Sequence, residues 1–172
     1  ANRSQRSYRG GGGYDNPYWI VNNIPGTEGV SRFFGNFKTT YNYSKWLNFG
    51  FNAGVDVTSD KRKQSFEIGS NTNRNGRILL DDYFTRQFDV NAFITGDIDF
   101  SDDFSFNYMV GTNFFSYTRE TNSIDGNNLA FPGFLDVSNA STILASEDLV
   151  TYKTAGIFVN SQIGWKKMAY LN

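Results

Sequence analysis

The stretch from Arg32 to Thr58, RFFGNFKTTYNYSKWLNFGFNAGVDVT, alternates apolar and polar side chains along most of its length. Its aromatic and aliphatic residues fall mainly on odd positions on both sides of a short break at 44–46. Phe34 is the one large apolar residue on the even side of the first half. A period of two is the pattern of a β-strand with one apolar face. The stretch therefore predicts two long strands joined by a turn at 44–46.

These two strands can be paired in one register. If 44–46 is the turn, Tyr41 faces Phe49 and Phe33 faces Val57, so that apolar side chains meet on one face. Polar side chains then meet on the other face, and a slip by one residue would invert both faces. We therefore expect an antiparallel hairpin with an apolar and a polar face.

The same construction recurs towards the C-terminus. Residues 84–100 and 104–114 carry apolar side chains on even positions and surround a second short turn at 101–103. In this pairing Tyr108 faces Gly96, where an aromatic ring can cover the glycine. A fifth apolar alternation ends at Trp165, and a turn at 166–168 opens the start of a sixth strand.

The remaining segments are expected to be loops. Two long connections lie at about 59–81 and 119–150, and residues 1–31, including the flexible run Gly10–Gly13, also indicate a loop. Strands that exceed about ten residues, with short turns on one side and long loops on the other, are typical of outer-membrane barrels. In such a barrel the short turns are periplasmic, while the long loops and residues 1–31 are extracellular.

The predicted class is an all-β, antiparallel transmembrane β-barrel, with residues 32–172 forming part of its wall. Five full strands and the start of a sixth cannot close, and an open edge in lipid would leave backbone groups unpaired. We therefore expect a segment of a larger barrel.

The alternation assigns a direction to each strand residue. Expected lipid-facing residues are Phe33, Phe37, Tyr41, Phe49, Phe51, Val55, Val57, Phe88, Val90, Ile94, Phe106, Tyr108, Val110, Ile157, Val159 and Ile163. Expected lumen-facing residues are Asn36, Lys38, Asn48, Asn52, Asp89, Asn91, Asp97, Asn107 and Asn113. The aromatic residues expected in an interfacial girdle near the short turns are Tyr43, Trp46, Phe100, Phe104 and Trp165.

Composition excludes several classes of function. The 172 residues include no Cys and no His, and the formal net charge is -1. Disulfides, thiol nucleophiles and the commonest general base and metal ligand are therefore absent, and no basic field would attract nucleic acid. The acidic pairs at 81–82 and 102–103 lack the features of a catalytic dyad, and the second lies in a predicted turn. We predict no catalytic residues, metal or cofactor, and no enzymatic activity.

Mean hydropathy is low for a membrane protein, but a two-faced strand explains it. The value is -0.47 although 17% of residues are aromatic, and no apolar run is long enough for a transmembrane helix. A low mean results when apolar residues that face lipid are averaged with polar residues that face water. The alternative is a secreted β-sandwich that binds carbohydrate, because sandwich strands also alternate.

Several motifs resemble the SusC/RagA family of TonB-dependent outer-membrane transporters. They are Asn16-Pro17-Tyr18-Trp19 with Asn22-Asn23, Arg32-Phe33, the run 59–63, the segments 126–133 and 137–140, Gly164-Trp165-Lys166 and Tyr170-Leu171-Asn172. This resemblance implies a 22-stranded barrel with an N-terminal plug, in the outer membrane of a Bacteroidetes-type Gram-negative bacterium. It further implies import of polar nutrients, oligosaccharides or peptides, with a SusD-like surface lipoprotein and energy from TonB. No plug or TonB box is matched here.

Two loop features have candidate roles. The run Lys61-Arg62-Lys63 is expected to be a solvated loop, or alternatively to contact lipopolysaccharide phosphates. In the second long loop, Asn128, Phe131, Pro132 and Phe134 are candidates for contact with a lid partner or ligand.

Overall fold

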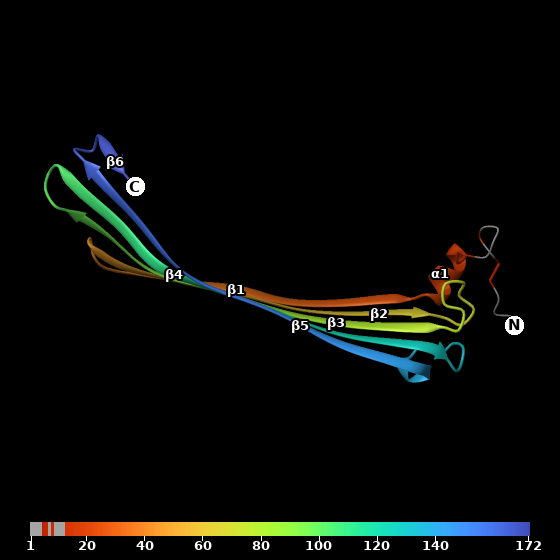
Figure 1. The fold of residues 1–172 in the computed structure, drawn as a ribbon. Helices are drawn as coiled ribbons and strands as arrows, with labels where there is room; N and C mark the ends of the chain where they lie inside the picture. Colours follow the sequence, from red (N-terminus) through yellow and green to blue (C-terminus); the bar gives the residue numbers. More distant parts are fainter. Residues whose placement is uncertain (1–4, 7, 9–12) are drawn as a thin grey trace. The chain divides into compact units, whose positions relative to one another are not determined.

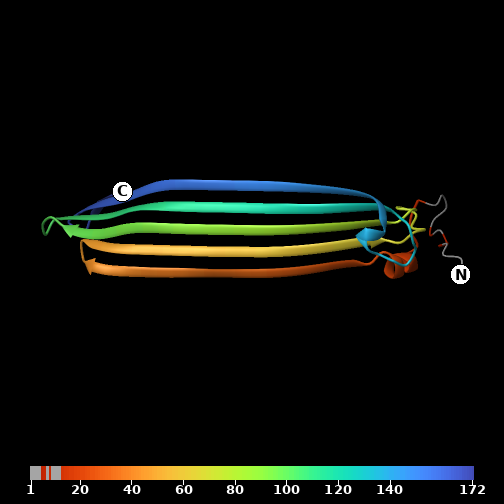
Figure 2. The same cartoon turned by 90° about the horizontal axis from the view of Figure 1, so that it is seen from below.

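The computed structural model describes residues 5–6, 8 and 13–172. They form one six-stranded antiparallel sheet in which each strand neighbours the next in chain order (Figure 1; Figure 2). The elements are α1 (Pro17–Asn23), β1 (Gly26–Ser44), β2 (Leu47–Phe66), β3 (Arg77–Asp99), β4 (Phe104–Leu129), the 3-10 turn η1 (Val137–Asn139), β5 (Ala140–Trp165) and β6 (Ala169–Leu171). The predicted all-β class is confirmed, and one sheet takes the place of the two packed sheets of a sandwich.

The chain divides into two compact units, which are described separately. The turn unit contains the three short turns, and the loop unit contains α1, η1 and the longer connections. The turn unit comprises Arg32–Val57, Thr85–Thr118 and Val150–Asn172, and the loop unit comprises Ala1–Ser31, Thr58–Phe84 and Arg119–Leu149.

The short connections of the turn unit lie close to the predicted positions. Lys45 and Trp46 join β1 to β2, so that Ser44, which was expected in the turn, is the last residue of β1. Residues 100–103 join β3 to β4, and the amide of Phe100 donates to the carbonyl of Phe104 at 3.0 Å. Residues 166–168 join β5 to β6, and Trp165 pairs with Ala169. The hairpins inferred from the alternation are therefore present.

The prediction of a loop over residues 1–31 was wrong in two places. Residues 17–23 form α1, where Asn16 accepts the Tyr18 amide at 2.9 Å and Pro17 occupies the first turn. Strand β1 begins at Gly26, before the hydrophobic alternation does. Seven helical residues are too few to give a readable period. The predicted flexibility of Gly10–Gly12 lies outside the described residues.

The predicted first long loop, 59–81, is also too long. The connection is 67–76, because β2 continues to Phe66 and β3 starts at Arg77. The ladder continues although residues 59–65 are all polar: the Ser65 amide donates to the carbonyl of Pro25 at 3.0 Å. Backbone pairing does not need a hydrophobic face, so the alternation ended before the strand did.

The predicted second long loop, 119–150, is shortened in the same way to 130–139. In this region polar cross-strand pairs replace apolar ones. The Arg77 guanidinium donates to both oxygens of Asp125 at 2.9 and 2.8 Å, and the Ser123 hydroxyl donates to Asp81 at 2.6 Å. Such pairs stabilise adjacent strands while hiding the period on which the sequence prediction relied.

Few apolar side chains are buried. Among the described residues, the buried hydrophobic side chains are Ile78 and Leu129, both in the loop unit. Many large apolar residues of the turn unit are exposed; the exposed fraction is 67% for Phe33 and 83% for Ile157. No helix among the described residues could cross a membrane by its length and apolar character. Burial within this chain therefore does not account for the apolar residues.

Candidate functional site

The two faces of the first hairpin are separated as the alternation predicts. On one face Phe37 contacts Phe51 and Tyr41 contacts Phe49, each with ring centroids 6.4 Å apart. On the other face the Asn36 amide donates to the Asn52 oxygen at 2.9 Å. All of these contacts join residues of equal parity, which is the arrangement of an antiparallel pair with two distinct faces. We call the face that carries Asn36 the polar face and the opposite one the apolar face.

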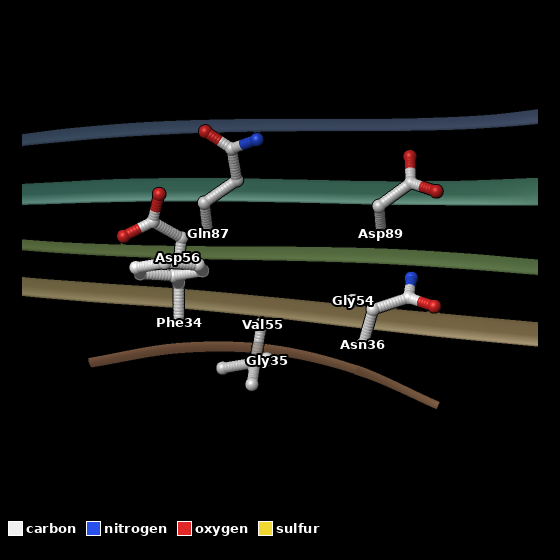
Figure 3. Close-up of a pocket in the computed structure, with 8 residues that line it drawn as sticks. All are labelled: Phe34, Gly35, Asn36, Gly54, Val55, Asp56, Gln87 and Asp89. Atoms are coloured by element: carbon white, nitrogen blue, oxygen red, sulfur yellow. The ribbon is translucent and has the colours of Figure 1, made fainter. Parts of the chain in front are cut away.

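Figure 3 shows this separation around one recess of the turn unit. The side chains of Phe34, Asn36, Asp56, Gln87 and Asp89 point to one side of the sheet. The side chain of Val55 points to the other side, although it lines the same recess through its backbone. Residues from β1, β2 and β3 therefore share the polar face.

Hydrogen bonds extend the polar face across β3 and β4. The Asn91 amide donates to Asp89 at 2.6 Å, and the Asn113 amide donates to the Asn91 oxygen at 2.8 Å. Further along, the Asn107 amide donates to the oxygen of Gln162 at 3.4 Å. Five of the nine expected lumen-facing residues thus form two networks, Asn36 with Asn52 and Asp89 with Asn91 and Asn113. The side chains of Lys38, Asn48, Asp97 and Asn107 join neither network.

Two aromatic residues on the polar face escaped the sequence reasoning. A Cβ placed on Gly50 would lie 2.3 Å from the Phe93 ring, and one placed on Gly111 would lie 2.4 Å from the Phe158 ring. The rings therefore lie directly over these glycines and fill gaps in the sheet surface. The sequence did contain an indication of these residues, because each Phe occupies a position of the parity that otherwise carries polar side chains.

The predicted covering of Gly96 by Tyr108 is confirmed. A Cβ on Gly96 would lie 2.7 Å from the Tyr108 ring and 1.9 Å from the carbonyl oxygen of Trp46. The Tyr108 hydroxyl also donates to that carbonyl at 2.6 Å. The ring thus closes over the glycine while its hydroxyl is bound to the end of the first hairpin.

Aromatic residues gather near the short turns. Tyr43 and Trp46 meet edge to face at 6.3 Å, and Phe100 lies 6.2 Å from Phe106. Several are well exposed, with exposed fractions of 70% for Phe100 and 64% for Tyr43. Phe104 and Trp165, the other expected girdle residues, are exposed as well. Their role at a membrane interface remains a prediction.

In the loop unit, buried polar side chains hold the connections in place. Asn139 accepts the Phe131 amide at 3.0 Å and donates to the carbonyls of Phe131 and Phe134, each at 2.7 Å. Glu67, from the other connection, accepts the Gly133 amide at 2.8 Å. The backbone of loop 130–139 is therefore fixed at several points, while the rings of Phe131 and Phe134 are exposed.

Of the four loop candidates, three lie together at this fixed tip. Phe131, Pro132 and Phe134 are consecutive or nearly so, whereas Asn128 lies at the end of β4 with a left-handed φ of 59°. The Asn128 oxygen accepts the Asn75 amide at 3.1 Å, which binds it to loop 67–76. The side chain of Asn128 is therefore bound to loop 67–76.

A second polar cluster of the loop unit was not predicted. Buried Asp15 accepts the Thr72 hydroxyl at 2.8 Å, the Asn71 amide at 2.6 Å and the Gln5 amide at 2.5 Å. Burial alone raises the pKa of the Asp15 carboxyl, but these hydrogen bonds outweigh it and hold the pKa below its usual value. Beside this cluster the Trp19 indole donates to Ser70 at 3.0 Å, so that α1 lies against loop 67–76 (Figure 1).

The expectation that Lys61-Arg62-Lys63 forms a solvated loop was wrong, because these residues lie in strand β2, which continues to Phe66. Arg62 pairs with Asp60 and Glu28 at 2.6 and 3.4 Å, and its guanidinium lies over the Tyr83 ring. Lys61, Arg62 and Lys63 all line one recess, together with Leu80 and Ile124. No cluster of acidic side chains suited to a metal ion occurs within residues 5–6, 8 and 13–172.

Comparison with known proteins supports the fold through structure. No protein-family model matches the sequence, and no curated protein matches it significantly. A solved chain of the RagAB peptide transporter has a TM-score of 0.79 and 14% identity, covering 90% of this chain and 18% of that chain. RagAB peptide importer chains in a "closed-closed" and an "open-open" state have TM-scores of 0.78 and 0.75, with 13% and 15% identity. They cover 89% and 90% of this chain.

The chain thus spans 18% of the length of each of these solved chains. At such low identity the likeness concerns the fold. It agrees with the predicted segment of a barrel wall.

Proposed function

We propose that this chain forms part of the wall of an outer-membrane, TonB-dependent nutrient transporter of the SusC/RagA type. The single observation that carries the proposal is the two-faced sheet, in which exposed aromatic and aliphatic residues lie opposite a hydrogen-bonded amide and carboxylate surface. The fold shared with RagAB transporter chains supports it.

In this proposal the apolar face contacts the hydrocarbon of the outer membrane. Side chains such as Phe33, Phe51 and Ile157 are exposed in this chain, and water would be an unfavourable neighbour for so many of them. In lipid their exposure costs nothing, and the aromatic residues near the turns would lie at the interface. The apolar face and its girdle thus have a common explanation.

The polar face would line the hydrated lumen. Amides and carboxylates that satisfy each other, as Asp89, Asn91 and Asn113 do, form a wettable surface without a strong net charge. Such a surface suits the passage of polar solutes, oligosaccharides or peptides. The chain itself contributes a wall and no catalytic step.

The loop unit would lie on the extracellular side and the short turns on the periplasmic side. The fixed tip of loop 130–139, with exposed Phe131 and Phe134, would contact a SusD-like surface lipoprotein that acts as a lid. Energy for import would come from TonB. The host would be a Bacteroidetes-type Gram-negative bacterium.

The proposal is tested by locating the protein and measuring uptake. The full-length protein is expected in the outer-membrane fraction, with a mobility on gels that changes on boiling, as folded barrels show. Deleting its gene is expected to abolish growth on the imported oligosaccharide or peptide, and a copy lacking TonB coupling should not restore it. Recovery of the protein as a soluble secreted monomer would overturn the proposal in favour of the binding-module alternative.

A further inference from the structure

The recess of Figure 3 has the composition of a ligand site. It lies wholly in the turn unit, has a volume of about 330 Å³, and is lined by Phe34, Asn36, Asp56, Gln87 and Asp89 with the backbone of three neighbours. Small-molecule pockets range from about 300 to 1,000 Å³. The recess therefore has room for one small ring or one side chain.

Phe34 is the aromatic residue that lines this recess, and it is an apolar side chain on the polar face. Its exposed fraction is 73%. The Arg32 guanidinium carbon lies 5.5 Å from the ring centroid, and Arg32 is held by Asp56 through two hydrogen bonds, one of 2.9 Å. The ring is thus supported by a compensated ion pair and remains exposed.

Polar groups surround the ring. The Asn36 amide nitrogen donates to Asn52, which leaves the Asn36 oxygen able to accept. Asp89 accepts from Asn91 at 2.6 Å, and its second oxygen receives only the long 3.4 Å contact from Asn113. The Gln87 side chain is exposed and belongs to neither network. The recess therefore offers both donors and acceptors.

A neutral sugar ring fits this combination better than a peptide does. The C–H bonds on one side of a pyranose carry small positive charges that match the negative face of an aromatic ring. Its hydroxyl groups both donate and accept, as the amides of Asn36 and Gln87 require. A peptide carboxylate would instead need a cation, and the guanidinium of Arg32 is already paired with Asp56. The carboxylate of Asp89 accepts from the side-chain amides of Asn91 and Asn113, so that it too is already engaged in the hydrogen bonds of the polar face.

We propose that Phe34, Asn36, Gln87 and Asp89 form a binding subsite for a neutral sugar ring on the polar face. The inference rests on the proposed function, since it assigns this face to the lumen, and it names the substrate as an oligosaccharide. Phe34 stacks on the ring and the polar groups bind its hydroxyls.

The test uses the full-length protein in detergent, an array of neutral oligosaccharides and a peptide library. Phe34→Ala is compared with Phe33→Ala, which removes the adjacent ring from the opposite, apolar face. We expect Phe34→Ala to weaken oligosaccharide binding about tenfold, equivalent to about 1.4 kcal/mol, while Phe33→Ala leaves the dissociation constant unchanged. Gln87→Ala should weaken binding less than Phe34→Ala.

Unchanged oligosaccharide binding by Phe34→Ala would overturn the inference, as would a protein that binds peptides and no neutral oligosaccharide. Heat-dependent gel mobility of each variant reports whether the barrel has assembled. If Phe34→Ala assembles and still imports nutrient as the wild type does, the subsite is refuted and the proposed function stands. A wild-type protein that does not assemble in the membrane refutes both.

Discussion

The two units of this chain are stabilised by different means. The turn unit has few buried side chains and is organised by alternation, aromatic contacts and rings that lie over Gly50, Gly96 and Gly111. In the loop unit, buried polar residues such as Glu67 and Asn139 bind the backbone of loops. One unit has two chemically different faces, and the other has connections that are held in fixed positions.

The comparison shows which features of a sequence can be read directly. The face of a strand can be recognised in the sequence, because every second residue has the same requirement for an apolar or a polar side chain. A single buried Asn that binds three backbone groups leaves no repeating trace. The following experiments probe this contrast.

The largest effect is expected from a charge on the apolar face of the turn unit. Phe51→Arg would place a guanidinium towards lipid, at a cost of about 2–4 kcal/mol near the bilayer midplane. We expect loss of the folded barrel from the outer-membrane fraction, measured by heat-dependent gel mobility. Asn52→Arg, one residue away on the polar face, should assemble normally. Equal failure of both variants would contradict the two-faced assignment.

A smaller effect is expected from filling a covered glycine. In Gly96→Ala the new methyl carbon would lie 1.9 Å from the Trp46 carbonyl oxygen, so the backbone or the Tyr108 ring must move. We expect the free energy of unfolding in lipid to fall by about 3 kcal/mol. Gly156→Ala is the control, because a Cβ there meets nothing within 4 Å. If the two variants unfold at the same urea concentration, the ring does not pack on Gly96 as described.

In the loop unit, removing one amide should loosen one loop. Asn139→Ala leaves the Phe131 amide and the carbonyls of Phe131 and Phe134 without their partner. A cost of about 1–3 kcal/mol is expected, largely confined to 130–139. Hydrogen exchange read by mass spectrometry should show faster exchange there, with the barrel strands unaffected. Asn122→Ala, which removes an exposed amide on β4, should change neither the stability nor the hydrogen exchange of loop 130–139. Unaltered exchange of this loop in Asn139→Ala would show that Asn139 does not fix it.

The smallest effect is expected when the pH is lowered, and it concerns the stability of loop 67–76. The pKa of Asp15 is lower in the folded loop than its ordinary value of 3.8. Asp15 therefore stabilises the loop fully above pH 3.8, and this contribution declines as the pH falls through the lowered pKa. Exchange of the Asn71 and Thr72 amides, corrected for intrinsic rates, should accelerate as the pH falls below 3.8. Asp15→Asn should remove this pH dependence; a dependence that persists in the variant must come from another group.

Much of the turn unit follows from its residues. The parity of Phe37, Tyr41, Phe49 and Phe51 predicts their contacts, and Gly96 predicts its covering ring. Phe93 and Phe158 were missed because alternation assigns a whole face by the majority of its residues. An apolar residue on a polar face is informative only beside the glycine that it covers, and that pairing depends on register between strands.

The loop unit was predicted poorly for a physical reason. The strand ends are stabilised by polar pairs such as Arg77 with Asp125, which need no hydrophobic period. Asp15 acts through residues more than fifty positions away in sequence, at 71 and 72. Contacts of this kind depend on the fold being formed, so local pattern does not contain them.

The central claim, that alternate residues of β2 face lipid and water, has a direct test. The chain contains no cysteine, so it adds no background thiol to a full-length protein in which any other cysteine has been replaced by serine. Single cysteines are then placed at each position from Asn48 to Val57 except Gly50, which the Phe93 ring covers. Labelling of the assembled protein in membranes with a water-soluble maleimide is then measured. The account predicts reaction at even positions and protection at odd ones. Uniform labelling along β2, or protection at the even positions instead, would contradict it.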